Sequence, residues 1–181
     1  MQGPQALITF WFVEHGYDDW FGGKPEFDAQ CAERFSDLHA EVARGEAWTW
    51  RETPEGRLAE LVLLDQFSRQ LHRGSPLAFA QDKMALALAQ EAVAGGHDMA
   101  VEQSWAMFFY MPYMHAESLV IQNEGVKLFE AFGNEDALKY MVDHRDTIAR
   151  FGRFPFRNAA LGRQSTPEEL AYMAEAGDRG F

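Results

Sequence analysis

The sequence has only one cysteine, few basic residues and no long apolar run. Because Cys31 is alone, the chain cannot form an intrachain disulfide, and no thiolate cluster can hold a metal. A lone cysteine is typical of proteins in a reducing compartment. There are 16 Lys and Arg residues against 28 Asp and Glu, so the formal net charge is −12. This charge argues against nucleic acid or an anionic membrane as a general partner.

Signals for membrane insertion and secretion are also missing from the sequence. The longest apolar stretches, such as 61–64 and 106–112, fall well short of the roughly 20 residues that cross a bilayer. Residues 1–12 lack the basic region, apolar stretch and cleavage site of a signal peptide. We therefore expect a soluble cytoplasmic protein. No two histidines have the sequence spacing of metal ligands, and we expect neither a bound metal nor a cofactor.

Apolar residues recur with a helical period almost throughout, and no segment alternates as a strand does. Several segments begin at a polar residue followed by proline and end at glycine, which are helix start and stop signals. The predicted helices cover residues 25–44, 54–73, 76–94, 103–111, 113–132, 135–151 and 167–176. The segment 103–111 is either a short helix or the first half of a helix bent at Pro112. The length of 181 residues and the 47% hydrophobic content predict a single all-α domain over 1–181. We expect about seven or eight helices in antiparallel pairs.

The common catalytic motifs are absent. The sequence has no phosphate-binding glycine loop, no G-x-S-x-G elbow and no H-E-x-x-H pair. Residues 144–146 spell the His-Arg-Asp triplet of kinases, but the asparagine and the glycine-rich loop of that family are missing. We interpret the triplet as a chance match.

Polar side chains occupy positions that the helical period assigns to the core in three predicted helices. These residues are Asp65 and Arg69, then His115, Ser118 and Gln122, then His144 and Arg145. Burial of such groups without partners costs a few kcal/mol each. They should therefore contact one another or a ligand.

A second unusual feature is an arginine-rich stretch without acids. Between residues 147 and 167 there is no Asp or Glu, whereas Arg150, Arg153, Arg157 and Arg163 all lie there. A guanidinium group presents a rigid fork of donors that suits a carboxylate or a phosphate. The sequence therefore indicates a local positive segment in an acidic chain.

Each of these features also has a purely structural interpretation. Asp65 with Arg69, and Asp146 with Arg150, stand four residues apart and can form ordinary helix pairs. Asp65 can instead pair with an arginine of the late loop as part of a buried network. Histidines at core positions are more often hydrogen-bonded structural residues than ligands. The sequence leaves these alternatives open.

Four stretches carry a resemblance to a known family. They are residues 63–69 with 72–74, then 78–82, then 110–112 with 115–117, and finally 144–146 through 153–158 to 161–163. Together they resemble the bacterial family called domain of unknown function 924, from Phe10 onward. The resemblance implies a tetratricopeptide-like α–α superhelix and brings no established reaction. The family usually has proline where Ser68 stands and often histidine where Phe156 stands, so a base at position 156 is absent here.

Three hypotheses for function follow. The first is a binding module for a small anionic ligand or a protein or peptide partner. The alternative is an enzyme for a phosphate- or carboxylate-bearing substrate, in which Asp65 or Glu117 orients His115 or His144 as acid or base. The third is a buried structural network without a ligand. A homodimer through Trp20 and Phe21 is also possible. The candidate ligand-binding residues are Asp65, Gln66, Arg69, His115, Glu117, Gln122, His144, Arg145, Arg153, Arg157 and Asn158.

Overall fold

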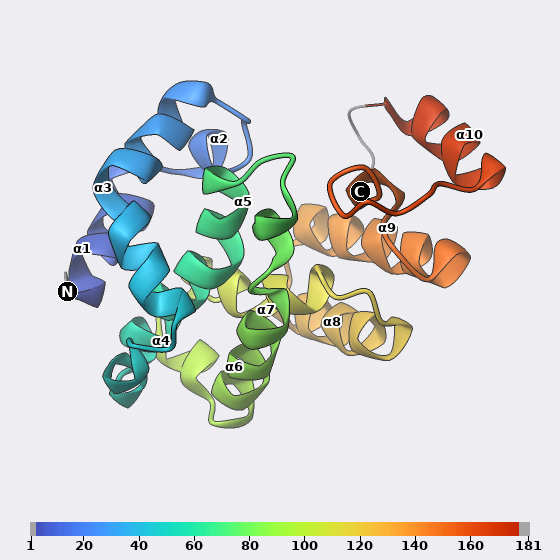
Figure 1. The fold of residues 1–181 in the computed structure, drawn as a ribbon. Helices are drawn as coiled ribbons and strands as arrows, with labels where there is room; N and C mark the ends of the chain where they lie inside the picture. Colours follow the sequence, from blue (N-terminus) through green and yellow to red (C-terminus); the bar gives the residue numbers. More distant parts are fainter. Residues whose placement is uncertain (1–2, 178–181) are drawn as a thin grey trace. The chain divides into compact units, whose positions relative to one another are not determined.

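The computed structural model describes residues 3–177, and every regular element in that range is helical (Figure 1). The predicted all-α fold is therefore confirmed. The α-helices are α1 (Pro4–Thr9), α2 (Tyr17–Trp20), α3 (Pro25–Ala43), α4 (Pro54–Val62), α5 (Ser68–Leu71), α6 (Asp82–Ala94), α7 (Met107–Met114), α8 (Leu119–Phe132), α9 (Glu135–Phe151) and α10 (Pro167–Ala176). The 3-10 segments are η2 (Trp48–Glu52), η4 (Pro76–Phe79), η5 (His97–Ala100), η6 (Gln103–Trp105) and η7 (Pro155–Arg157), and the π-helical turns are η1 (Phe10–Glu14) and η3 (Leu63–Phe67).

Local capping chemistry sets several helix starts where the sequence predicts them. Helix α3 begins at Pro25, whose fixed φ suits the first helical position. The side chain of Asn134 accepts a hydrogen bond from the Ala137 amide (2.9 Å) and starts α9. Thr166 and Glu169 form the reciprocal capping box of α10. No helix in the described part of the chain is long and apolar enough to span a membrane.

The helix predicted from residue 113 to residue 132 is wrong in its first part. Helix α7 continues through Pro112 to Met114, and α8 begins only at Leu119. The cause lies in Gln122, whose Nε2 donates to the carbonyl oxygens of Met114 (2.7 Å) and Ala116 (2.8 Å). These bonds satisfy carbonyls at the end of α7 without a continuous helix. His115 and Ser118 therefore lie in a connection rather than on a helix face.

The helix predicted over 54–73 is helical but not uniform. Between α4 and α5, residues 63–67 form the wider π-helical turn η3, which contains Asp65 and Gln66. Both side chains are buried. Such turns occur as single insertions in α-helices and are frequent at functional sites.

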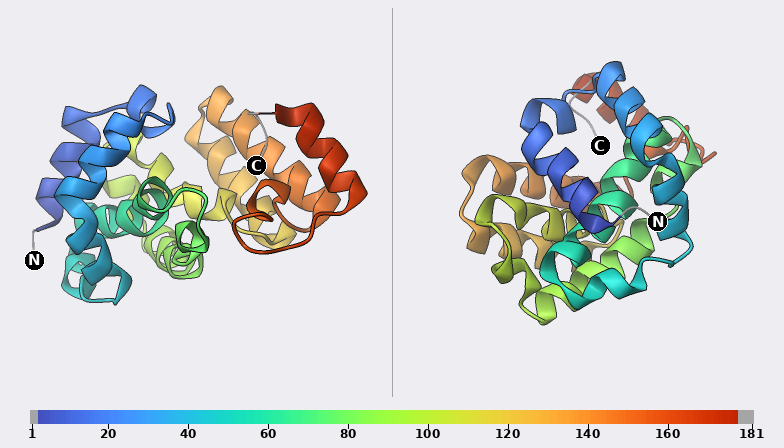
Figure 2. Two further views of the ribbon diagram at one scale, coloured as in Figure 1. Left: turned by 45° about the horizontal axis from the view of Figure 1, so that its top comes forward. Right: turned by 90° about the vertical axis from the view of Figure 1, so that its left-hand side faces the viewer.

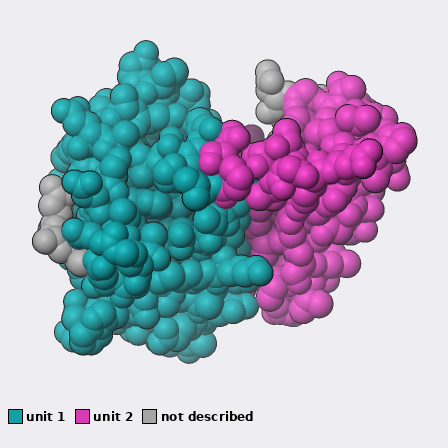
Figure 3. Space-filling model, viewed as in Figure 1, with its two compact units in different colours: residues 1–73, 77–112 teal, residues 74–76, 113–181 magenta. Residues whose placement is uncertain are grey.

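Contacts within the chain define two compact units, coloured separately in Figure 3. Unit 1 comprises residues 1–73 and 77–112, and unit 2 comprises residues 74–76 and 113–181. The single domain that the sequence predicts and the tetratricopeptide-like superhelix that the family resemblance implies stay predictions, and the units are described separately.

Unit 1 is held by helix packing around an aromatic core. Helix α1 packs on α4, and α3 packs on α5 and η3. The rings of Phe10, Phe35 and Phe67 meet at centroid distances of 4.9 to 6.2 Å and are almost fully buried. Rings of this size contribute much of the apolar area that leaves water on folding.

Unit 2 is built on the helix pair α8 and α9, which lie side by side in Figures 1 and 2. Gly125 permits their close approach, since a Cβ atom there would lie 2.9 Å from Cε of Met141. Helix α10 packs against η7 and completes the unit. The late loop between α9 and α10 thus lies within one compact unit.

Burial of His39 predicts a loss of stability in mild acid. The Ser68 hydroxyl donates to the Leu64 carbonyl (2.6 Å), so His39 Nε2 donates to Ser68 Oγ (2.9 Å). Burial, and secondarily the nearby His72, lowers the pKa of His39 to about 4. Unfolded histidine binds its proton near pH 6.5, so stability should fall as the pH falls from about 6.5 to about 4.

We expect His39 to account for about 1–3 kcal/mol of that loss, after allowance for solvent screening. Chemical denaturation of His39→Gln, which keeps a donor for Ser68, should show a weaker dependence on pH across this window. His97→Gln serves as the matched histidine control and should retain the wild-type dependence. Equal pH dependence in wild type and His39→Gln would contradict the assignment.

Candidate functional site

In unit 1, Asp65, Gln66 and Asp82 form a hydrogen-bonded cluster around Arg69. Its Nη1 donates to the Asp65 carbonyl (2.8 Å) and to Asp82 Oδ1 (2.9 Å), and it lies 3.2 Å from Asp65 Oδ1. Burial alone would lower the pKa of Arg69, but the charges of Asp65 and Asp82 raise it overall. Gln66 Nε2 donates to Asp65 Oδ2 (2.6 Å). The candidates Asp65, Gln66 and Arg69 therefore satisfy one another, as the helix-pair interpretation predicts.

Arginines of the acid-free segment in unit 2 form ion pairs with acids that lie outside this segment. Arg153 pairs with Glu169 (2.6 Å), and Arg150 pairs with Glu168 (2.9 Å), both from α10. Arg145 pairs with the adjacent Asp146 (2.6 Å) at the surface of α9. Much of the positive charge that the sequence indicates is therefore neutralised by glutamates and an aspartate in the folded chain.

Glu169 is the centre of the late loop. Its side chain is almost fully buried and accepts hydrogen bonds from Arg153, Asn158 and the Thr166 amide at 2.6 to 3.2 Å. The Arg153 hydrogen bond, with support from the Thr166 amide and against the effect of burial, lowers the pKa of Glu169 to about 2. This stabilisation is complete above pH 4.5 and is lost as the pH falls toward 2.

Arg163 and Glu117 extend these contacts to the start of α8. Arg163 forms two hydrogen bonds to the Glu117 carboxylate (2.7 and 2.9 Å) and a third to Asn158 Oδ1 (2.8 Å). Burial alone would raise the pKa of Glu117, but hydrogen bonds from Arg163 and the Phe154 amide lower it. We call Glu117, Arg153, Asn158, Arg163 and Glu169 the loop network. It fixes residues 152–169 against the 115–118 connection.

Two histidines and one arginine lie beside the loop network. The imidazole rings of His115 and His144 have centroids 6.3 Å apart. Arg157 donates to the carbonyl oxygen of His115 (3.0 Å), and its Cζ lies 4.4 Å from the centroid of the Phe154 ring. The His144 ring contacts the same phenyl ring at 5.5 Å. Phe154 therefore forms a shared apolar base for His144 and Arg157.

The tautomer of His144 follows from its contact with α9. Its Nδ1 lies 2.7 Å from the carbonyl oxygen of Tyr140, which can only accept a hydrogen bond. The Nδ1 atom must therefore carry a proton, and Nε2 is the basic nitrogen of the neutral ring. His144 is almost fully buried, whereas His115 and Arg157 are half-buried.

Gln122 fixes the backbone next to the cluster of His115, His144 and Arg157. It is fully buried, and its bonds to the carbonyls of Met114 and Ala116 flank His115 on both sides. Its Oε1 atom has no hydrogen-bond partner. Gln122 therefore acts through the backbone that carries His115.

The structure brings seven of the eleven candidates together in unit 2. They are His115, Glu117, Gln122, His144, Arg153, Arg157 and Asn158. Arg145 belongs to the same unit but pairs at the surface, and Asp65, Gln66 and Arg69 form the separate cluster of unit 1. Among the described residues, no group of three or more His, Cys, Asp or Glu is arranged to hold a metal ion.

Sequence reasoning missed the residues that complete each cluster. Asp82 is the second acid at Arg69, and Phe154 is the ring beneath Arg157. Glu169 was not among the candidates, although its side chain both caps α10 and holds Arg153. The signal available for Glu169 was its place in the pair of acids, Glu168 and Glu169, that follows the acid-free interval.

The fold and these contacts define an all-helical protein with arginine–carboxylate networks. The chain belongs to the family described as bacterial protein of unknown function (DUF924), whose model matches residues 7–177. A protein of unknown function from Agrobacterium tumefaciens, whose structure is solved, is 40% identical to this chain. The match covers 95% of this chain and 97% of that chain, with a TM-score of 0.91. No curated protein matches this sequence.

The central role of Glu169 predicts unequal effects from two adjacent substitutions. Glu169→Gln removes the charge that Arg153 and Asn158 share, and it should lower the free energy of unfolding by about 1–3 kcal/mol. Glu168→Gln alters an exposed pair with Arg150 and should change that free energy by less than about 0.5 kcal/mol. Urea titration measures both. Similar losses in the two variants would contradict the role assigned to Glu169.

Proposed function

We propose that the protein is a binding module for an anionic group, and that unit 2 receives this group at Arg157, His115 and His144. The group is a phosphate or carboxylate of a small molecule or of a partner. The observation that carries the proposal is that the Arg157 guanidinium and the His144 imidazole share the Phe154 ring, with the His115 imidazole beside that of His144. Arg157 and His115 can donate hydrogen bonds to an oxyanion, and His144 donates from Nε2 when both of its ring nitrogens carry a proton.

The contacts of Arg157 support its choice among the arginines of this segment. Arg157 donates to the carbonyl oxygen of His115 and lies over the Phe154 ring, and its charge also acts on Glu117. A guanidinium stacked on a ring keeps its orientation while its edge presents donors. Arg157 is thus positioned for a planar or tetrahedral oxyanion.

The loop network supplies the rigidity that such a site requires. Glu117 accepts from the Phe154 amide (2.8 Å), and Gln122 holds both neighbours of His115. The side chains that would contact the anion are therefore anchored by other residues. Preorganised donors bind an anion with less loss of conformational freedom.

One observation favours a second candidate, an enzyme for a small phosphate- or carboxylate-bearing substrate. With Nδ1 of His144 donating to Tyr140, Nε2 is a base in the neutral ring. Turnover of a phosphate ester that is lost in His144→Asn, which keeps the donor to Tyr140, would favour this candidate.

Inorganic phosphate provides the direct test of anion binding. If the dissociation constant is about 1 mM, 10 mM phosphate stabilises the folded protein by about 1.4 kcal/mol. The melting temperature should then rise by about 3–5 °C in a thermal-shift assay. Arg157→Ala should lose most of this rise, because its guanidinium would contact the anion.

The matched control is Arg150→Ala, which removes an arginine of the same segment from an exposed pair with Glu168. This variant should keep the phosphate-induced rise. A rise of equal size in Arg157→Ala, or no rise in the wild-type protein at any phosphate concentration up to about 50 mM, would reject the proposal.

A further inference from the structure

We propose that unit 1 carries a docking surface for an arginine-bearing peptide. The surface consists of five aromatic side chains that contact one another in series. We call it the aromatic strip, and it is formed by Tyr17, Phe21, Trp20, Phe12 and Trp105. This proposal goes beyond the anion site in unit 2, because it concerns a different unit and a partner of opposite charge.

The rings of the aromatic strip are continuous. Tyr17 and Phe21 have centroids 4.9 Å apart, and Phe21 and Trp20 have centroids 6.2 Å apart. Phe12 then contacts Trp20 at 5.8 Å and stacks on Trp105 at 4.6 Å. Segments far apart in the sequence thus contribute to one row of rings.

The strip is open to solvent along its length. Tyr17 is 58% exposed and Phe21 is 42% exposed, while the other three rings are partly exposed. Trp20 is held in place because its Nε1 donates to the carbonyl oxygen of Trp11 (2.9 Å). Large aromatic side chains gathered at a surface mark interaction sites more often than isolated exposed rings do. The fixed orientation of Trp20 indicates a prepared surface.

Charge around the strip selects a cationic partner. Asp18 follows Tyr17 directly, and Glu102 begins the turn that carries Trp105. Both acids are exposed. Glu102 accepts a hydrogen bond from the Ser104 hydroxyl (2.8 Å), and the charge of Asp18 acts on Lys24, which pairs with Asp19 (2.8 Å). A second copy of this chain would bring the same acids and a net charge of −12 to the contact. Repulsion therefore opposes self-association and favours a basic segment.

Arginine suits this surface better than lysine does. A guanidinium stacks on aromatic faces and still donates to carboxylates at its edge. In an extended peptide, alternate side chains on one face are about 6.6 Å apart. This spacing is close to the centroid separations of the strip, so alternating arginines can lie over successive rings.

The test uses a fluorescent peptide of about ten residues in which arginine alternates with serine, and its glutamate–serine counterpart. Fluorescence anisotropy should show binding of the arginine peptide alone. The double variant Tyr17→Ser/Phe21→Ser should weaken binding about tenfold, since each exposed cation–π contact contributes a factor of about two to five. Asp18→Asn/Glu102→Gln should weaken it by a smaller factor.

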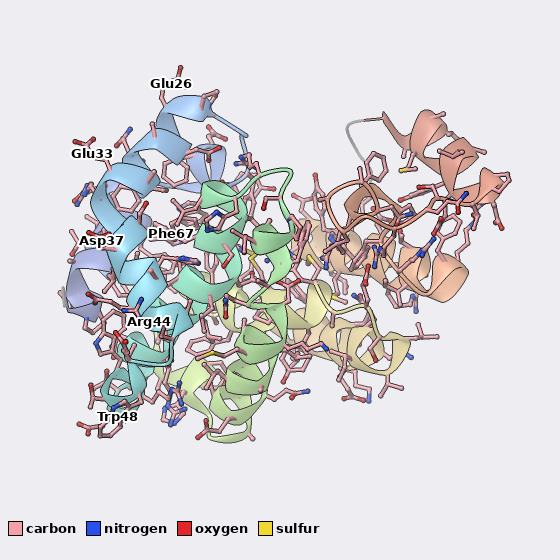
Figure 4. The ribbon with its side chains drawn as sticks, viewed as in Figure 1. Glu26, Glu33, Asp37, Arg44, Trp48 and Phe67 are labelled. Carbon is pink, nitrogen blue, oxygen red and sulfur yellow. The ribbon has the colours of Figure 1, made fainter. Side chains whose placement is uncertain are left out.

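Trp48→Ser is the matched control. Trp48 is 64% exposed in the same unit, but it follows the C-terminal end of α3, whereas α2 lies near the N-terminal end (Figures 1 and 4). This variant should bind the peptide as the wild type does. Circular dichroism and melting temperature establish that each variant is folded.

Three results would overturn the proposal. They are no binding of the arginine peptide by the wild type, equal binding by Tyr17→Ser/Phe21→Ser, and an equal loss in Trp48→Ser. A dimer in sedimentation that dissociates in Tyr17→Ser/Phe21→Ser would instead make the strip an interface between two copies. None of these outcomes alters the phosphate response of unit 2, so the two proposals fail separately.

Discussion

A buried carboxylate must be matched by donors, and in unit 2 that constraint organises the late loop. Glu169 lies inside the loop and receives Arg153, Asn158 and a backbone amide of its own helix cap. A charge removed from water is tolerated only when such partners are present. The Glu169 side chain therefore connects the start of α10 to the preceding loop. Asn158 extends these contacts, because its Oδ1 accepts a hydrogen bond from Arg163.

The same segment carries the proposed anion site. Arg153 pairs with Glu169, and Arg163 pairs with Glu117. Arg157 lies on the Phe154 ring beside two histidines, which are anchored through Tyr140 and Gln122. Glutamates from outside the acid-free stretch thus allow this stretch to be part of a compact unit.

The sequence predicted features that depend on local chemistry. Proline and capping residues set the beginnings of α3, α9 and α10, because each acts within one turn of its own helix. The break at residues 115–118 was not predicted, since it depends on the Gln122 side chain folding back on α7. Short helices at the N-terminus were also missed. They are stabilised by contacts with α4 and by aromatic packing, which helical periodicity does not report.

The candidate site was predictable in its residue types but not in its pairing. Arginines, histidines and core-facing polar residues were evident in the sequence. Glu117 and Arg163, however, are 46 positions apart, and only the fold shows that they form a pair. The family and the related Agrobacterium tumefaciens structure agree with the helical fold. Neither supplies a ligand, so the contacts of Arg157, His115 and His144 carry the functional argument.

The central claim is that an oxyanion binds beside these two histidines. The most direct measurement is a ¹⁵N-resolved NMR spectrum of the histidine side chains during a titration with phosphate. The account predicts that neutral His144 is protonated at Nδ1 before phosphate is added. It also predicts that the ring signals of His115 and His144 shift together and saturate, while those of His39 do not. Ring signals of His115 and His144 that stay unchanged to saturating phosphate would contradict it.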